Sequence, residues 1–408
     1  MAVNLAPPQQ LLPVPGVRVG SACAQIKQDK RNDLALFDFA PETRIAGVYT
    51  QSHFAAAPVH MARANEAQTG FGCRSWVVNS GNANAATGEP GLSDAGTICG
   101  KAARLLQLPD TEVQPFSTGV IGERLPVERM TAALDECYTN LSPDGWLDAA
   151  QAIMTTDTVP KGRSLQLELE GELVTITGIA KGSGMIKPNM ATMLAYMACD
   201  AKVSGPMVKQ LVSDAVEKTF NRVTVDGDTS TNDCFMLACS GQVQQSEIKQ
   251  TSDPRYATLL KGITEVATWL AQCLARDGEG ATKFITVQVD GGVSAQDCLA
   301  VAYTIAESPL VKTAMFAGDA NWGRLCMAIG RAPTPNIEAD KVNVWLDDVQ
   351  VAQAGLMSPS YTEAAGAAVL AQEEFLVRVD LGLGAASETV WTTDLSYEYV
   401  RINAEYRT

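Results

Sequence analysis

The chain has 408 residues, of which 46% are apolar and 19% charged, a balance typical of a globular protein with a sizeable core and room for two or three domains. Its net charge of −15 comes without a basic stripe, which excludes nucleic acid and anionic membranes as main partners. No apolar run reaches the length of a membrane span.

The cysteines and histidines limit the kinds of disulfide, metal and catalytic site that the chain can form. The 10 cysteines stand singly, without a C-x-x-C pair, so we expect free thiols in a reducing compartment. The proline-broken N-terminus lacks the basic start of a secretory signal, and we therefore expect a cytoplasmic protein. His53 and His60 are the only histidines. A histidine-based metal site would have few ligands, and the general base is expected to be something other than an imidazole.

The first half of the chain predicts short strands, two helices and a hairpin. Ser93 is the expected N-cap of the first helix, and a proline opens the second. Alternation around Gly171 predicts the hairpin, which delivers the chain to Lys181. The expected strands are 45–50 and 75–79, the helices 93–108 and 126–138, and the hairpin 165–179.

The second half alternates strands and helices, which indicates stacked sheets covered by helices. Residues 193–203 read as a buried strand, 223–241 as strand, polar loop and strand, and Asp253-Pro254 as the start of the longest helix. The remaining expected elements are helices from Ser204 to Phe220, 295–305 and 309–316, and strands 284–289, 342–346, 375–381, 387–395 and 397–402. A domain boundary is expected near 276–283, where the longest helix ends.

The tract KGSGMIKPNMATML, Lys181 to Leu194, is the most informative segment. A glycine-rich loop runs directly into an apolar stretch opened by Thr192. A threonine in this position can attack the preceding peptide bond, and hydrolysis of the resulting ester makes it a new N-terminus. Its hydroxyl is then a nucleophile and its amine, with a pKa of roughly 7.7–8.0, a built-in base. The alternative is an ordinary turn that feeds a buried strand.

This tract resembles the autoprocessing motif of the ornithine acetyltransferases, the glutamate N-acetyltransferases of arginine biosynthesis, which are enzymes of the N-terminal-nucleophile type. Five more segments match that family in order, so the resemblance covers essentially the whole chain: STGVIGE (117–123), MTTDT (154–158), DGDTSTND (226–233), GEGATK (278–283) and GDANWGR (318–324).

The resemblance implies a helix-covered α-β-β-α sandwich (1–277) with a smaller C-terminal α/β domain (278–408). It implies self-cleavage between Ala191 and Thr192 into an alpha chain, 1–191, and a beta chain, 192–408. Thr192 would then carry an acetyl group from N2-acetylornithine to glutamate. Thr118 and Gly119 would form the oxyanion hole, a role that a hydroxyl and a glycine amide can both fill.

The resemblance also assigns the substrate contacts and the partners. The two processed chains are expected to associate, as a heterotetramer, with no required cofactor and no metal. Whether acetyl-CoA is a second acetyl donor stays open, because family members are either bifunctional or restricted to recycling. The substrate-binding residues that it implies are Thr155, Lys181, Thr192, Glu279, Asn403 and Thr408.

Two polar loops resemble other kinds of site. The DGDTSTND loop has the carboxylates of a calcium loop, but its glycine is second rather than sixth and no downstream glutamate follows. A polar loop beside the active site fits better. SGNANAATGEPG (80–91) has glycines but no phosphate-binding signature, and reads as a turn-rich loop that could line the substrate cleft.

Three alternatives stay open at this point. An N-terminal-nucleophile aminopeptidase or amidase would share Thr192 but release its product to water. A cleavage-dead structural or regulatory relative would remain one chain of 43.3 kDa. A metal-dependent enzyme built on Asp226 would lose its activity with a chelator.

Overall fold

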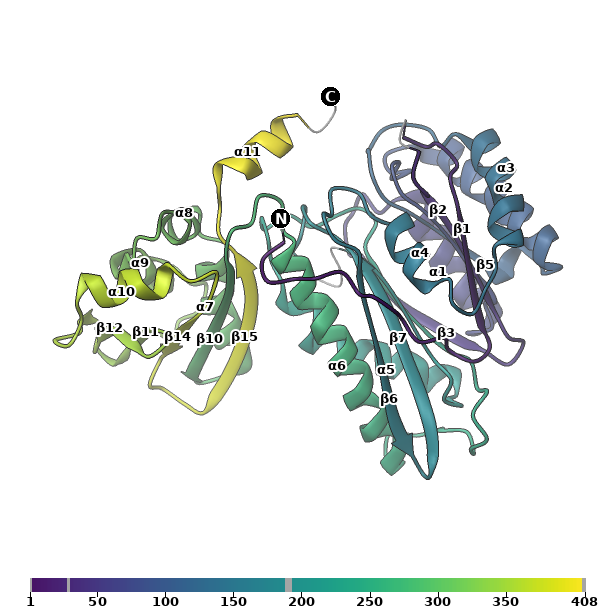
Figure 1. The fold of residues 1–408 in the computed structure, drawn as a ribbon. Helices are drawn as coiled ribbons and strands as arrows, with labels where there is room; N and C mark the ends of the chain where they lie inside the picture. Colours follow the sequence, from purple (N-terminus) through teal and green to yellow (C-terminus); the bar gives the residue numbers. More distant parts are fainter. Residues whose placement is uncertain (1, 28–29, 188–192, 406–408) are drawn as a thin grey trace.

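The computed structural model describes residues 2–27, 30–187 and 193–405, which form three sheets and the helices that cover them (Figure 1). The first sheet has the order β1-β2-β4-β5. The second has the order β3-β9-β8-β7-β6, in which only β8 and β9 pair in parallel. Their strands are β1 (Val17–Ala22), β2 (Leu34–Phe39), β3 (Arg44–Tyr49), β4 (Ser75–Asn79), β5 (Val113–Ser117), β6 (Lys161–Leu169), β7 (Glu172–Lys181), β8 (Leu194–Cys199) and β9 (Cys234–Cys239).

These two sheets pack face to face around an aromatic cluster. The rings of Trp76 on β4 and Tyr196 on β8 lie 5.4 Å apart, and Phe37 contacts both. The outer face of the first sheet is covered by α2 (Gly88–Leu106) and α3 (Val127–Thr139). That of the second is covered by α5 (Gly205–Lys218) and α6 (Pro254–Arg276). The predicted α-β-β-α sandwich is therefore confirmed.

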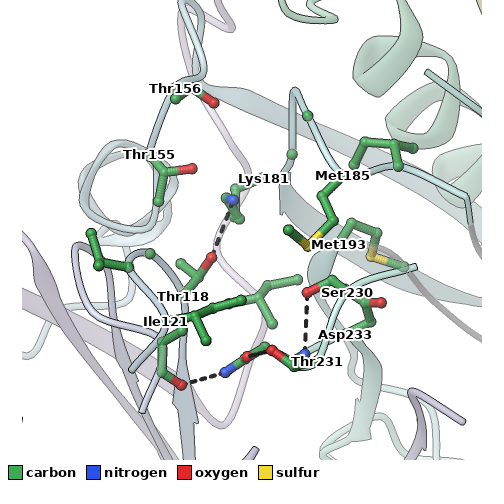
Figure 2. A pocket seen from close by; sticks show the side chains of 18 of the residues that line it. Thr118, Ile121, Thr155, Thr156, Lys181, Met185, Met193, Ser230, Thr231 and Asp233 are labelled. Carbon is green, nitrogen blue, oxygen red and sulfur yellow. Dashed lines mark hydrogen bonds between the residues drawn. The ribbon is translucent and has the colours of Figure 1, made fainter. Parts of the chain in front are cut away.

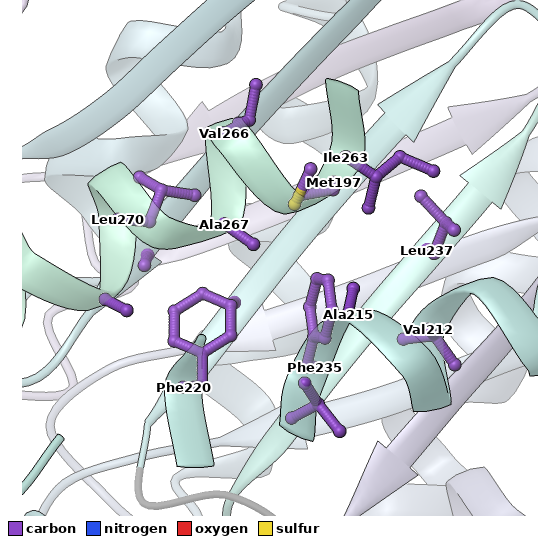
Figure 3. Close-up of a cluster of buried hydrophobic side chains, with 14 of the residues drawn as sticks. Met197, Val212, Ala215, Phe220, Phe235, Leu237, Ile263, Val266, Ala267 and Leu270 are labelled. Carbon is purple, nitrogen blue, oxygen red and sulfur yellow. The ribbon is translucent and has the colours of Figure 1, made fainter. Parts of the chain in front are cut away.

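The layer between the second sheet and its helices is a continuous apolar core (Figure 3). Leu270 and Val266 of α6 are fully buried over the sheet, and the rings of Phe220 and Phe235 lie 5.1 Å apart beneath them. This spacing of apolar residues along α6 is the helical period seen in the sequence. The side chain of Asp253 caps the helix by accepting from the Arg255 amide, as predicted.

The third sheet is made entirely of residues after 283 and has the order β13-β12-β11-β14-β10-β15. Helix α7 packs on β10 and β15. The strands are β10 (Phe284–Gly292), β11 (Asn343–Leu346), β12 (Val349–Gln353), β13 (Leu356–Met357), β14 (Glu374–Asp380) and β15 (Ala386–Thr393), and the helices are α7 (Ala295–Ala306), α8 (Pro309–Ala317), α9 (Trp322–Gly330) and α10 (Glu363–Leu370). The domain division at 277/278 stays a prediction.

Three element predictions were wrong. The first long helix begins at Gly88 rather than after Ser93, so Ser93 lies inside α2. Residues 223–225 make only an isolated bridge, between Val223 and Trp391. Residues predicted as the last strand form helix α11 (Tyr397–Ala404). There the Ser396 side chain accepts from the Glu398 amide, which starts a helix that an alternating sequence had concealed.

Several short elements had no expectation at all. Helices α1 and α4 pack at the edges of the space between the two sandwich sheets. The elements without an expectation include α1 (Ala57–Thr69), α4 (Trp146–Ala152) and three 3-10 turns, Asp110–Glu112, Phe220–Arg222 and Ala339–Lys341, together with β1, β2, β5, β12, β13, α9 and α10. Within the described ranges, no helix has both the length and the hydropathy needed to cross a bilayer.

We predict that Leu270→Ala lowers the free energy of unfolding by about 2–5 kcal/mol, because it opens a void in a close-packed layer. Leu173→Ala is the matched control, since Leu173 is 58% exposed and its truncation should cost less than ~0.5 kcal/mol. Urea unfolding of both variants measures the difference. Equal losses would show that the layer beneath α6 is not the packed core described here.

Candidate active site

A cavity of about 260 Å³ opens where β7 ends and β8 begins (Figure 2). In this view, Thr118, Thr155 and Lys181 lie on one side, and Met185, Met193, Ser230 and Asp233 on the other. Six predicted site residues line it: Thr118, Gly119, Thr155, Lys181, Glu279 and Asn403. Ala191, Thr192 and Thr408 lie outside the described residues, whereas Met193, next to Thr192 in the chain, is part of the wall.

Strand register explains why segments distant in sequence meet here. Lys181, the last residue of β7, pairs with Leu194, the first of β8. Leu194 in turn pairs with Cys234, the first residue of β9. The end of one strand and the starts of two others therefore share one edge of the sheet, and the loops that continue from them enclose the cavity.

The STGVIGE segment supplies a sharp turn on one wall. The Thr118 amide donates to the Asn79 carbonyl over 3.0 Å, which fixes the turn to the end of β4. Gly119 has a φ of +133°, and a Cβ there would come 2.2 Å from the carbonyl carbon of Gly81. Only glycine fits. Among the residues that the structure describes, none accepts a hydrogen bond from the Gly119 amide.

Lys181 connects this turn to the sheet edge. Its Nζ donates to Thr118 Oγ1 over 3.2 Å, and the residue is only 8% exposed. Burial lowers the pKa of Lys181, although the negative charge of Asp157 opposes the shift. The lysine therefore gives up its proton more readily than an exposed lysine.

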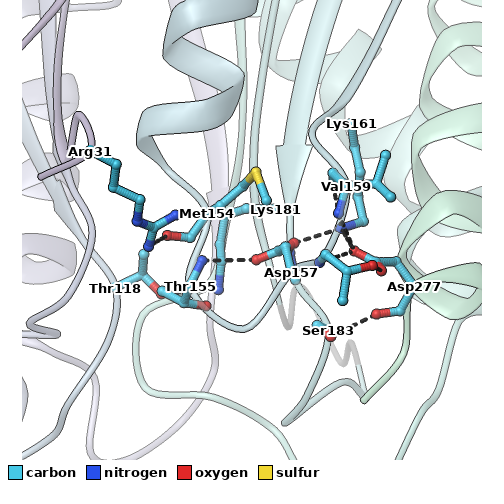
Figure 4. Close-up of polar contacts among 12 residues, drawn as sticks. Arg31, Thr118, Met154, Thr155, Asp157, Val159, Lys161, Lys181, Ser183 and Asp277 are labelled. Atoms are coloured by element: carbon cyan, nitrogen blue, oxygen red, sulfur yellow. Dashed lines mark hydrogen bonds and ion pairs between the residues drawn. The ribbon is translucent and has the colours of Figure 1, made fainter. Parts of the chain in front are cut away.

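A buried ion network lies behind Thr155 and Lys181 (Figure 4). Lys161 Nζ is 2.6 Å from Asp157 Oδ1 and 2.6 Å from Asp277 Oδ2, and all three side chains are at most 1% exposed. Burial alone would raise the pKa of Asp157, but the charges of Lys161 and Lys181 hold it well below its usual range. The Asp157 carboxyl group is thus kept ionised.

The two aspartates of this network position the cavity wall, Asp157 through its carboxylate and Asp277 through its backbone carbonyl. Asp157 accepts from the Thr155 amide over 3.0 Å and from the Gly182 amide over 2.7 Å. The carbonyl of Asp277 accepts from the Ser183 hydroxyl over 2.6 Å. The sequence had predicted Thr155 but neither carboxylate, and the MTTDT match was the one signal that pointed to Asp157.

Glu279 and Asn403 approach the cavity from the C-terminal part of the chain. Asn403 on α11 donates to Glu279 Oε2 over 2.8 Å, and Glu279, 7% exposed, is fixed by its amide, which donates to the Ser183 carbonyl. A Cβ on Gly184 would come 2.4 Å from the Glu279 carboxyl carbon. The glycine is required because the carboxylate packs directly on the loop.

Asp226 has a structural role in the loop that resembled a calcium site. Its two oxygens accept from the amides of Met185 and Ile186 over 2.6 and 2.8 Å, and Tyr399 on α11 donates to it over 3.3 Å. The loop thereby clamps the segment that follows Lys181. Among the described residues, no group of three or more His, Cys, Asp or Glu side chains is arranged to hold a metal ion.

Of the two remaining motifs, SGNANAATGEPG contributes to the cavity and GDANWGR does not. Ala83, within SGNANAATGEPG, lines the cavity, and Asn232 joins it to the STGVIGE turn by donating to the carbonyls of Ala83 and Ser117 over 2.6 and 2.8 Å. GDANWGR lies away from the cavity. Its first glycine, Gly318, ends α8 and its Asn321 caps α9, so this match reflects the fold around the third sheet.

We predict that Lys161→Met lowers the free energy of unfolding by about 3–5 kcal/mol, because two buried carboxylates lose their counter-charge. Lys101→Met is the control: Lys101 pairs with Asp135, which is 59% exposed, and its loss should cost less than ~1 kcal/mol. Denaturant titration near neutral pH compares the two variants. A Lys161→Met protein as stable as Lys101→Met would contradict the network's role.

The chain was also compared with known proteins. A family model described as the ArgJ family matches residues 18–408. Proteins named arginine biosynthesis bifunctional protein ArgJ from Pseudomonas fluorescens (strain Pf0-1) and Pseudomonas syringae pv. tomato (strain DC3000) are each 50% identical over 408 residues, 100% of both chains. A crystal structure of the protein of the same name from Bacillus halodurans covers 51% of this chain and 96% of its own, with 35% identity and a TM-score of 0.49. The chain belongs to the ArgJ family.

Proposed function

We propose that this protein transfers an acetyl group from N2-acetylornithine to glutamate through an acetyl ester on Thr192. One observation carries the proposal: Thr118, Gly119 and Lys181 converge on a cavity whose wall includes Met193, the residue that follows Thr192. Family membership supports it, because relatives that match this chain over its whole length are named for arginine biosynthesis.

The proposed reaction consists of two acyl transfers. The Thr192 hydroxyl attacks the acetyl carbonyl carbon, its proton passes through the Thr192 amine to the departing nitrogen, and ornithine leaves. The amine of glutamate then attacks the ester carbonyl carbon, and the bond from this carbon to the Thr192 oxygen breaks. The amine proton passes to that oxygen, which restores the Thr192 hydroxyl, and acetylglutamate leaves. Each tetrahedral intermediate carries an oxyanion, which the Thr118 hydroxyl and the free Gly119 amide can stabilise.

We propose that self-cleavage after Ala191 precedes this cycle. Residues on either side of the cut belong to one sheet: β7 pairs with β8 over six residues, from Ile176 with Cys199 to Lys181 with Leu194. β3, from the alpha chain, pairs with β9 over six more. The proposed alpha and beta chains would therefore stay associated through backbone hydrogen bonds and a shared core.

Thr155, Lys181, Glu279 and Asn403 are proposed as substrate contacts because all of them line the cavity. Thr192 and Thr408 are proposed with them on the family resemblance. Glu279 is a carboxylate suited to an ammonium group of ornithine or of the acceptor. Acetyl-CoA is proposed as a second acetyl donor, because the full-length relatives are named bifunctional.

The proposal extends to the organisation of the protein. We propose a catalytic domain, 1–277, and a C-terminal α/β domain, 278–408, in a heterotetramer of processed chains in the cytoplasm. The all-thiol state of the 10 cysteines supports a reducing compartment. An amidase of the same nucleophile type remains the competing function, and it would pass the acetyl group to water.

Thr192→Ala tests the central step. We expect the variant to remain one chain of 43.3 kDa without acetyltransferase activity, whereas wild type separates into two chains and converts acetylornithine and glutamate into acetylglutamate. Intact-mass analysis and product assays measure both effects, with a parallel reaction supplied with acetyl-CoA. Thr97→Ala removes an exposed hydroxyl on α2 and should behave as wild type. An uncut wild type, or acetate as its only product, would refute the proposal.

Gly119→Ala tests the oxyanion turn. The added Cβ would clash with the Gly81 carbonyl group and displace the amide, so transfer should fall by about 10²–10³-fold, the usual cost of one lost donor. Gly122→Ala is the matched control: it lies in the same loop at φ +89°, with nothing within 4 Å of the new Cβ. The acetyl-transfer rates of the two correctly folded variants are compared. Equal rates would show that Gly119 has no role in the mechanism.

A further inference from the structure

Asp233 stands out among the carboxylates around the cavity. It immediately precedes β9, lines the cavity and is 2% exposed. Its backbone is fixed on both sides, because the Thr50 amide donates to the Asp233 carbonyl and the Cys234 amide to the Met193 carbonyl, each over 2.9 Å. The position of the side chain at the cavity wall therefore follows from the sheet (Figure 2).

One oxygen of this carboxyl group, Oδ2, has no hydrogen-bond partner within the part of the chain that the structure describes. Neighbouring aspartates differ. Asp157 accepts from Thr155, Gly182 and Lys161, and Asp226 accepts from three amides and a phenol. A buried carboxylate oxygen without a donor is costly and calls for an explanation. Because this oxygen lies in a cavity wall, a bound ligand that donates a hydrogen bond to it would explain why the protein supplies no donor.

Lys181, the lysine that lines the cavity, does not donate a hydrogen bond to Asp233 Oδ2. Lys181 donates to Thr118 and influences Asp233 only through its charge. Burial raises the pKa of Asp233 well above its usual range, against the opposing effects of Ser230 and Lys181. A positively charged donor at Oδ2 would favour the ionised form again.

We propose that Asp233 Oδ2 accepts a hydrogen bond from the nitrogen that gives up or receives the acyl group, which makes Asp233 a further substrate-contacting residue. The inference rests on the proposed transfer reaction. An amide N–H of the donor and an amine N–H of the acceptor can both donate to a carboxyl oxygen, and both must reach the carbon bound to residue 192. Water attacking the same ester can also donate to Oδ2, but no other contact holds it there, whereas the proposed contacts to the rest of the substrate place the nitrogen beside Oδ2.

The test is the partition of the acetyl-enzyme between amine and water. Wild type, Asp233→Asn and Asp228→Asn are each supplied with acetylornithine and glutamate, and acetylglutamate and acetate are measured together. In Asp233→Asn we expect the ratio of acetylglutamate to acetate to fall roughly ten- to a hundred-fold, the effect of losing one hydrogen bond to a charged group. Asp228 is an exposed residue of the same loop, and its variant should keep the wild-type ratio.

The ratio does not depend on how much enzyme is active, so a loss of folded or processed protein would leave it unchanged. An unchanged ratio in Asp233→Asn overturns the inference while the proposed function stands. A wild type that forms no acetylglutamate refutes the proposed function itself. Asp233→Ala is the second variant, with the same fall expected. If neither variant folds and is processed, Asp233 is a residue of the fold and the inference is overturned.

Discussion

The cavity depends on one buried lysine held between two carboxylates. Lys161 contacts Asp157, four residues before it, and Asp277, 116 residues after it. Charges this deep are tolerated only when they are paired and hydrogen-bonded, so the three segments that carry them have to meet. The end of α6, the start of β6 and the loop after α4 are thereby fixed to one another, and the amides of Thr155 and Gly182 are placed by the same contacts.

The continuity of the five-stranded sheet explains how a chain could be cut beside its active site and keep its fold. The two strands after the proposed cut, β9 and β8, lie between β3 and β7, which precede it, within one hydrogen-bonded sheet. The apolar layers on both faces contain residues from both sides as well, with Val174 and Ile176 packed in the same cluster as Leu270. A cut between residues 191 and 192 would therefore leave the described sheet and its apolar layers held together by contacts elsewhere.

The carboxylates around the cavity are of two kinds: some hold the surrounding loops, and others could contact a substrate. Three carboxylates position loops, because their oxygens accept hydrogen bonds from backbone amides and from Lys161: those of Asp157, Asp226 and Asp277. Glu279 keeps one oxygen bonded to Asn403, and Asp233 leaves Oδ2 open. A small polar substrate with an amine and a carboxylate would meet hydroxyls and a lysine on one side and the carboxyl groups of Asp233 and Glu279 on the other.

The sequence by itself determined the local elements and the nucleophile tract. The hairpin before Lys181 and the helix capped by Asp253 follow from periodicity and capping, which record hydrogen bonds between near neighbours. The tract from Lys181 to Leu194 named the family and, through it, the residues around the cavity. Tertiary structure alone decided the rest. Helix α11 formed where alternation predicted a strand, and distant residues hold it, since Tyr399 donates to Asp226 and Asn403 to Glu279. The pairing of Lys161 with Asp277 and the unsatisfied oxygen of Asp233 are contacts, or missing contacts, between distant segments, and no local pattern records them.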